Sequence, residues 1–287
     1  MKTPEYVTPT TLREALELLS GAGGGEAVVW AGGTGLGPLL RRGLASPAVL
    51  LGLEKVGELG GVQPADGGLR LGATVRLRDL QRSPVVAARV PALADAAGRV
   101  GNVRVRSLAT LGGHLCHADP AQDLPPVLVA LGARVCLVSL RGTRVLPLEE
   151  FFVGPLQTVL SPEELLTEVW VPGESASRNT VYARFAPRSP EDYPTVGVAV
   201  SVRLDPDGVC QEARVAVGGA GPTVLRITAA EQALVGGVLA GQRIRDAARE
   251  VEAAVDPWDD SRGSAEYKRA MARVWTERVL QKLADEV

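Results

Sequence analysis

Residues 27–37 read AVVWAGGTGLG, a short apolar run followed by a glycine-rich turn. The run at residues 27–30 is too short for a helix and is bounded by glycines, so it predicts a buried strand. Residues 36–42 after the turn predict a short helix. Glycines in such a turn let several backbone N–H groups approach a phosphate closely, because no side chain stands in the way.

Phosphate binding is one of three roles that this glycine turn could have. The second is purely structural, because a turn of this kind is also a necessity where a strand ends. The third is a Rossmann fingerprint, in which Glu54, which follows Gly32 by 22 residues, would bind a ribose. In the frame Gly33-x-Gly35, however, the third glycine would fall at Pro38, so the Rossmann spacing is strained.

A second glycine turn occurs within residues 110–125, which read TLGGHLCHADPAQDLP. Two such turns predict a long ligand with a pyrophosphate that is held from two sides. Carboxylates near these turns suit sugar hydroxyls, because a carboxylate accepts hydrogen bonds from OH groups and repels phosphate. Asp119 before Pro120 and Gln122 has the form of a helix cap. Asp123 is therefore the better candidate for a ribose or ribityl ligand.

Two further interpretations of this segment are weaker. His114, Cys116, His117 and Asp119 are residue types that bind metals, but their spacing matches no standard site and the chain has only two histidines. Cys116 could be a nucleophile beside a histidine, but no third group to orient the base is evident. The sequence thus predicts no metal site and no catalytic residue in this chain.

Composition excludes several classes of function. The 287 residues are 46% hydrophobic, and 31 Lys and Arg against 33 Asp and Glu give a net charge of -2. Such a chain has no broad positive field for nucleic acid or an anionic membrane. The start of the chain lacks the apolar stretch of a signal peptide, and no run of about 18 apolar residues could span a bilayer, so no membrane insertion and a cytoplasmic location are expected.

The three cysteines are too few, and too widely spaced, for a disulfide framework or an iron–sulfur site. Any iron–sulfur cluster that works with this protein must therefore lie on another chain.

Further elements are expected on both sides of the two glycine turns. Residues 11–19 predict a helix that ends at the glycines of residues 21–25, and residues 85–100 predict a helix that Pro91 interrupts. A helix is expected to begin at Pro120. The turn-prone PGESASR at residues 172–178 predicts a domain boundary, beyond which residues 180–185, 196–204 and 213–217 predict antiparallel strands. Helices are expected at residues 243–253 and 264–283.

Four blocks in order over about 200 residues resemble one family. They are AGGTGLGPLLRRG, VGNVRVRSLATLGGHLCHADPAQDLPPVLVALGA, FFVGPLQTVLSPEELLTEVWVP and YARFAPRSPEDYPTVGVAVSV. The family comprises the flavin subunits of molybdenum-type carbon monoxide dehydrogenase and the flavin domain of xanthine dehydrogenase. The resemblance implies an α+β fold, with a two-subdomain FAD-binding domain of the vanillyl-alcohol-oxidase type at residues 1–175 (subdomains at about 1–55 and 56–175). A smaller C-terminal domain with an antiparallel sheet and helices follows at residues 176–287.

The resemblance also implies the FAD contacts. It assigns the pyrophosphate to two loops, at residues 32–36 and 110–113, and matches Asp123 to an acid that binds FAD hydroxyls. It places Leu166 near a flavin-contacting apolar position and Arg184 where a FAD-binding Lys is usual. Tyr193 either lies beside the isoalloxazine ring or anchors the domain junction. The implied cofactor-binding residues are Ala31, Gly32, Gly33, Thr34, Gly35, Leu36, Thr110, Gly112, Gly113, His114, Asp119, Asp123, Leu166, Arg184 and Tyr193.

The implied activity is electron transfer. The chain would pass electrons from iron–sulfur clusters through FAD to NAD, a quinone or oxygen. The resemblance implies a molybdenum-cofactor large subunit and a two-iron two-sulfur small subunit as partners, in a dimer of heterotrimers. Two alternatives stay open: a free-standing FAD oxidoreductase with its own substrate pocket, and a non-catalytic scaffold that keeps the fold.

Overall fold

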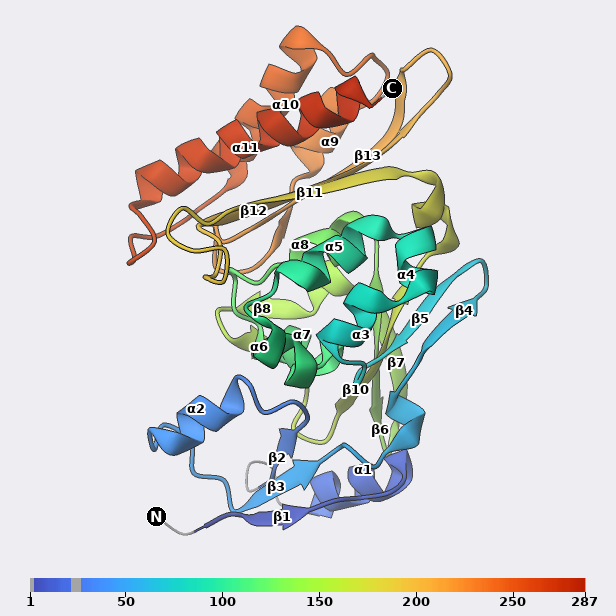
Figure 1. Ribbon diagram of the computed structural model, residues 1–287, viewed down its shortest axis with the longest axis vertical. Coiled ribbons are helices and arrows are strands. Elements are labelled where there is room, and N and C mark those ends of the chain that lie inside the picture. Colours follow the sequence, from blue (N-terminus) through green and yellow to red (C-terminus); the bar gives the residue numbers. More distant parts are fainter. Residues whose placement is uncertain (1–2, 22–26, 287) are drawn as a thin grey trace.

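The computed structural model describes residues 3–21 and 27–286, so most of the glycine-rich break at residues 21–25 lies outside the described residues. Three units follow one another along the long axis of the molecule (Figure 1). An N-terminal unit lies at one end, a five-stranded sheet with short helices occupies the middle, and a second antiparallel sheet with long helices lies at the other end. This mixture of helices and largely antiparallel sheets confirms the expected α+β class.

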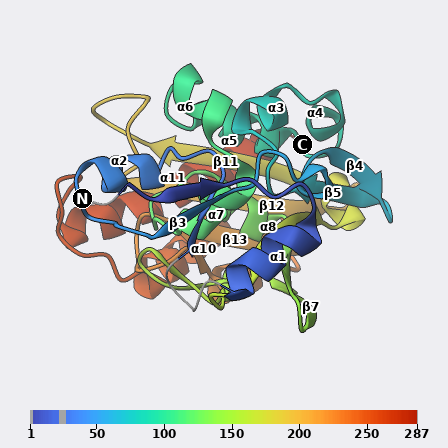
Figure 2. The same ribbon diagram turned by 90° about the horizontal axis from the view of Figure 1, so that it is seen from below.

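The N-terminal unit is a parallel sheet of order β1-β3-β2. Its α1 helix buries the apolar face formed by Ala15, Leu16 and Leu19, and Thr11 Oγ1 accepts a hydrogen bond from the N–H of Glu14 at its start. Seen from below, these N-terminal elements lie in front of the other two units (Figure 2). The elements are β1 (Glu5–Val7), α1 (Leu12–Gly21), β2 (Ala27–Trp30), α2 (Leu36–Arg41) and β3 (Val49–Gly52).

The middle unit is an antiparallel sheet of order β4-β5-β10-β6-β7 with short helices against it. Its strands are β4 (Val62–Ala65), β5 (Gly68–Gly72), β6 (Arg134–Ser139), β7 (Gly142–Pro147) and β10 (Leu165–Val171), with the small pair β8 (Phe152–Gly154) and β9 (Gln157–Thr158). Its helices are α3 (Leu77–Arg82), α4 (Pro84–Arg89), α5 (Pro91–Arg99), α6 (Val103–Leu108), α7 (Leu111–His117) and α8 (Leu124–Ala130). The break expected at Pro91 is present, because that residue begins a new helix.

Helix α8 fixes the geometry between the middle unit and the C-terminal unit. All seven of its residues are buried, as its sequence LPPVLVA requires, because it has no polar face to turn toward water. It packs against α5 of the middle unit and against three strands of the C-terminal sheet. The helix begins at Leu124, so the expectation that it begins at Pro120 is wrong. Asp119 instead closes a short turn, in which its Oδ1 accepts a hydrogen bond from the Ala121 N–H at 2.9 Å.

The C-terminal unit is an antiparallel sheet of order β11-β12-β13-β14 covered by helices on the side away from α8. Its elements are β11 (Asn179–Phe185), β12 (Val196–Leu204), β13 (Cys210–Gly218), β14 (Leu225–Arg226), α9 (Thr228–Leu234), α10 (Gly241–Ala254) and α11 (Ala265–Asp285). The three antiparallel strands and two long helices expected from the sequence are all present. None of the helices within residues 3–21 and 27–286 is long and apolar enough to cross a membrane.

Candidate functional site: a cleft with two chambers

Two adjoining cavities form one cleft beside the two glycine segments. The first, the apolar chamber, has a volume of about 340 Å³, and the second, the polar chamber, has a volume of about 280 Å³. Both chambers share four lining residues: Thr34, Gly35, Gly113 and His117. The glycine segments therefore meet where the chambers join, as the sequence predicts for a ligand held from two sides.

The first glycine segment is a turn between β2 and α2 with unused hydrogen-bond donors. Gly33 has a φ of +65°, and a Cβ there would lie 2.2 Å from the ring of Trp30, so only glycine fits. Among the described residues, no acceptor takes the N–H groups of Gly33, Thr34 or Gly35. These donors are available to an anion in the joint between the chambers.

The second glycine segment is not a turn, which corrects the expectation. It forms the first turn of α7, and the side chain of Thr110 caps this helix by accepting the Gly113 N–H at 3.1 Å. The N–H of Gly112 donates to the Ala73 carbonyl at 2.7 Å. A Cβ on Gly112 would lie 2.7 Å from the Cβ of Ala73, so glycine is required here for close packing against the residue that follows β5.

The apolar chamber is bounded by side chains from three parts of the chain. Trp30 comes from β2, Leu160 from the segment before β10, and Leu166 from β10 itself. Leu166 is almost fully buried. Such walls suit a flat, weakly polar group that is removed from water.

The polar chamber contains two buried atoms without partners. His114 Nε2 and Gln122 Oε1 both lack a hydrogen bond among the described residues, although both residues line the chamber and are more than nine-tenths buried. Burial, with a smaller contribution from His117, lowers the pKa of His114 to about 3, so its imidazole is neutral near pH 7. Buried polar groups are rarely left unpaired, which points to a ligand with matching donors and acceptors.

Asp123 lies between the chamber and the C-terminal sheet. Its Oδ1 accepts a hydrogen bond from the hydroxyl of Tyr182 at 2.7 Å and lies 2.9 Å from Nε of Arg184. That Nε–H is not aligned for a hydrogen bond, so the contact with Arg184 is electrostatic. Burial raises the pKa of Asp123 to about 6, although Arg184 and Tyr182 act in the opposite direction.

Arg184 uses the rest of its guanidinium to bind backbone. It donates to the carbonyl oxygens of Arg99, Pro190 and Asp192, and it thereby ties the end of α5 to the loop that carries Tyr193. Tyr193 lines the polar chamber and remains 45% exposed, which places it where the chamber opens to solvent. Arg184 therefore positions both Asp123 and the Tyr193 loop.

The structure brings most of the predicted site residues to the cleft, in different chambers. Leu166 lines the apolar chamber, whereas Asp123 and Tyr193 line the polar one, and three predicted residues line neither: Gly32, Asp119 and Arg184. A Cβ on Gly32 would lie 2.1 Å from the carbonyl oxygen of Leu108, so this glycine serves packing. Glu54, the acid of the Rossmann alternative, accepts a hydrogen bond from Tyr6 and lies outside the cleft.

Several residues of the cleft are absent from the sequence-based set. His117 follows His114 by one helical turn, so the helical spacing of α7 could have placed both on the cleft. Gln122 precedes Asp123, and nothing in its local sequence marks it as buried. Trp30, Leu160 and Glu164 come from segments far apart in the chain, and only the fold reveals that they meet.

Comparison with known proteins assigns both parts of the chain. The family described as the FAD binding domain in molybdopterin dehydrogenase matches residues 2–174, and the carbon monoxide dehydrogenase flavoprotein C-terminal domain matches residues 182–283. The 6-hydroxypseudooxynicotine dehydrogenase complex subunit alpha of Paenarthrobacter nicotinovorans is 36% identical, over 98% of this chain and 95% of that protein. The carbon monoxide dehydrogenase medium chain of Hydrogenophaga pseudoflava is 33% identical, over 96% of this chain and 95% of that protein.

Solved structures agree with this assignment. A chain of carbon monoxide dehydrogenase from Hydrogenophaga pseudoflava, which lacks the Mo-pyranopterin moiety of its cofactor, superposes with a TM-score of 0.94 at 34% identity, over 98% of this chain and 96% of that one. A chain of quinoline 2-oxidoreductase from Pseudomonas putida 86 gives a TM-score of 0.93 at 30% identity, over 100% of this chain and 99% of that one. The chain is an FAD-binding oxidoreductase subunit that belongs to the molybdenum hydroxylase family.

Proposed function

We propose that this chain relays electrons from an iron–sulfur cluster on a partner subunit, through FAD, to an external acceptor such as NAD, a quinone or oxygen. Bound flavin supplies this chemistry because it accepts electrons singly and gives them up in pairs. The observation that carries the proposal is the cleft itself. It has an apolar chamber, a joint with unused N–H donors, and a polar chamber with unpartnered buried atoms, in the order that adenine, pyrophosphate and flavin would need.

The chambers differ in a way that orients the cofactor. The apolar chamber around Trp30 and Leu166 suits adenine, and the joint at Gly35 and Gly113 suits the pyrophosphate. We place the isoalloxazine in the polar chamber beside Tyr193, because this side chain is 45% exposed and an external acceptor could approach the ring there. Leu166 would then contact the adenosine part of FAD rather than the flavin ring.

The polar chamber fits the remaining part of FAD. Asp123 would accept hydrogen bonds from ribityl hydroxyls in its ionised form, while Arg184 holds the carboxylate in place. His114 and Gln122 would pair with polar atoms of the flavin or its ribityl chain. These contacts bind and orient the cofactor, and no side chain of this subunit is assigned a proton transfer to an organic substrate.

The partners that we propose are a molybdenum-cofactor large subunit and a two-iron two-sulfur small subunit, assembled as a dimer of heterotrimers. The chain's own three cysteines support a cluster on a different chain, because they are too few to hold one. Substrate hydroxylation would belong to the large subunit, and a cytoplasmic location would suit the complex.

Two measurements test the proposal. The purified full-length chain should show the absorbance bands of oxidised flavin at about one FAD per chain. Co-expression with the neighbouring reading frames should yield a complex that contains molybdenum and iron, in which substrate bleaches the flavin absorbance. Flavin that is reduced by an organic substrate without any partner would favour a free-standing oxidoreductase, and a chain without flavin would favour a scaffold.

A further inference from the structure

One wall of the apolar chamber is formed by a segment without regular secondary structure. Residues 159–164 connect β9 to β10, and both Leu160 and Glu164 line the chamber. Leu160 also packs against the main hydrophobic core of the middle unit. The position of this segment therefore sets how closely the wall approaches a ligand in the chamber.

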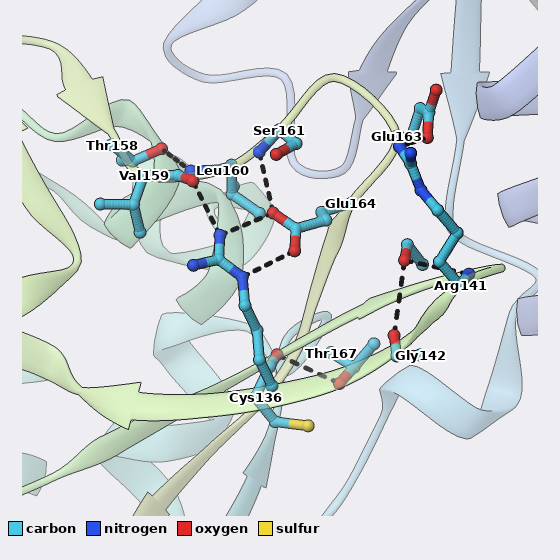
Figure 3. A network of polar contacts seen from close by, with 12 residues as sticks. Cys136, Arg141, Gly142, Thr158, Val159, Leu160, Ser161, Glu163, Glu164 and Thr167 are labelled. Carbon is cyan, nitrogen blue, oxygen red and sulfur yellow. Dashed lines mark hydrogen bonds and ion pairs between the residues drawn. The ribbon is translucent and has the colours of Figure 1, made fainter.

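Arg144 holds this segment at both ends. It lies on β7, the edge strand of the five-stranded sheet, and its Nε and Nη2 donate to the two carboxylate oxygens of Glu164, each at 2.7 Å. The same Nη2 donates to the Val159 carbonyl at 2.8 Å. The carboxylate of Glu164 also accepts the Ser161 N–H at 2.9 Å, and Figure 3 shows it facing the turn formed by Val159, Leu160 and Ser161.

The two side chains stay charged around neutral pH. Their mutual hydrogen bond is the main reason that the pKa of Glu164 is lowered and that of Arg144 is raised. Arg144 is 46% exposed and Glu164 is 12% exposed, so water screens the pair in part and its contribution to folding stability is modest. A bidentate guanidinium–carboxylate pair does, however, impose a specific geometry, here on the segment that it holds.

We propose that Arg144 and Glu164 are positioning residues that hold the wall of the apolar chamber against the adenosine part of FAD. The inference rests on the proposed function, since it requires FAD in the cleft with its adenine in the apolar chamber. FMN has the same isoalloxazine but no adenosine, so it does not reach this wall. The pair therefore contributes to the preference of the chain for FAD over FMN.

A neighbouring ion pair supplies a matched control. Arg141 lies in the turn between β6 and β7, and Glu163 precedes Glu164. Arg141 is 78% exposed, and neither residue of this pair lines the chamber. In Figure 3, Glu163 points toward Arg141 and away from the turn that Glu164 faces. Removing this pair should leave the chamber wall in place.

The test compares FAD and FMN affinities of the flavin-free full-length chain by titration. In R144M we expect the dissociation constant for FAD to rise about tenfold and that for FMN to change less than about twofold. E164Q should also weaken FAD binding. R144K should be intermediate, because lysine keeps the charge but cannot donate two parallel hydrogen bonds to the carboxylate. R141M should match the wild type. The flavin absorbance spectrum of the FAD-bound variants should be unchanged.

Two outcomes would overturn the positioning role alone. One is an equal loss of FAD and FMN affinity in R144M, which would indicate a general structural defect, and the other is an unchanged preference for FAD in both R144M and E164Q. A wild-type chain that binds neither flavin would overturn the proposed function, and the positioning role with it.

Discussion

The two chambers of the cleft differ in how complete they are without a ligand. The apolar chamber is lined largely by apolar side chains, and its wall includes polar bonds made within the protein, as in the Arg144–Glu164 pair. In the polar chamber, two buried atoms, on His114 and Gln122, have no hydrogen-bond partner within the part of the chain that the structure describes, and the buried carboxyl of Asp123 has a raised pKa. A ligand would contribute burial of apolar surface in one chamber and satisfy polar groups in the other.

This difference separates two sources of ligand recognition. Apolar burial supplies affinity in proportion to area and discriminates weakly between groups of similar shape. Unpaired buried polar atoms discriminate strongly, because a ligand that lacks the matching donor or acceptor leaves their desolvation uncompensated. We therefore expect variants in the polar chamber to change selectivity and pH dependence, and variants at the joint to affect the whole ligand.

The largest effect is expected at the joint, because it belongs to both chambers. Gly35→Leu would place a branched side chain where the two chambers meet, and we expect FAD affinity to fall at least about 100-fold. Gly35 is a sharper choice than Gly33, where Trp30 would clash with any side chain and the fold itself would suffer. Isothermal titration of the flavin-free chain measures the loss.

Gly37→Ala is the control for this variant. Gly37 lies two residues farther along α2, does not line either chamber, and would place its Cβ at an ordinary 3.6 Å from Trp30. This variant should keep wild-type FAD affinity. If Gly35→Leu also retained stoichiometric FAD, the joint would not be where the cofactor crosses between the chambers.

The two glycine segments show how far the sequence alone predicts this site. Both were expected to be turns, and both do reach the joint of the cleft. They differ because Gly112 packs against Ala73, so that its segment becomes helical, whereas Gly33 takes a positive φ beside Trp30. Local composition reveals that glycine is needed, but the reason depends on neighbours that the fold supplies.

Regular elements were more predictable than the walls of the cleft. Apolar strands at residues 27–30 and 196–204 and the helix break at Pro91 follow from local pattern and appear as expected. The segment of residues 159–164 carries no periodicity, and it lines the same chamber as Trp30 although β2 and β10 belong to different sheets, which only the fold reveals. Asp119 shows the limit of capping rules, because its cap pattern closes a turn and α8 begins later.

A smaller, pH-dependent effect is expected in the polar chamber. If ionised Asp123 accepts FAD hydroxyls, protonation below its pKa of about 6 weakens binding, and FAD affinity should fall about tenfold between pH 7 and pH 5. The folding stability of the ligand-free chain should instead increase as pH falls over this range. A carboxyl whose pKa is raised on folding binds its proton more tightly when folded, so its contribution to stability increases as pH falls toward 5.

Asp123→Asn separates these contributions from those of other titrating groups. The variant keeps an acceptor for the hydroxyl of Tyr182 and loses the charge beside Arg184. Fluorescence titration with FAD and urea unfolding, each at pH 5, 6 and 7, should give flatter pH profiles than the wild type. Profiles that coincide with those of the wild type would assign the pH dependence to another residue.

The smallest effect, and the most specific, is expected at Gln122. Its Oε1 is buried and finds no partner among residues 3–21 and 27–286, so Gln122→Leu should stabilise the ligand-free chain by about 1 kcal/mol. If FAD donates a hydrogen bond to this oxygen, the same variant should bind FAD about fivefold more weakly. Urea unfolding with and without FAD measures both changes, and Gln63→Leu on the exposed face of β4 is the control. A fivefold loss of affinity corresponds to about 1 kcal/mol, so the gain in stability should nearly vanish in saturating FAD. That outcome requires that the polar chamber is completed by its ligand, whereas an equal gain with and without FAD would mean that Gln122 serves packing alone.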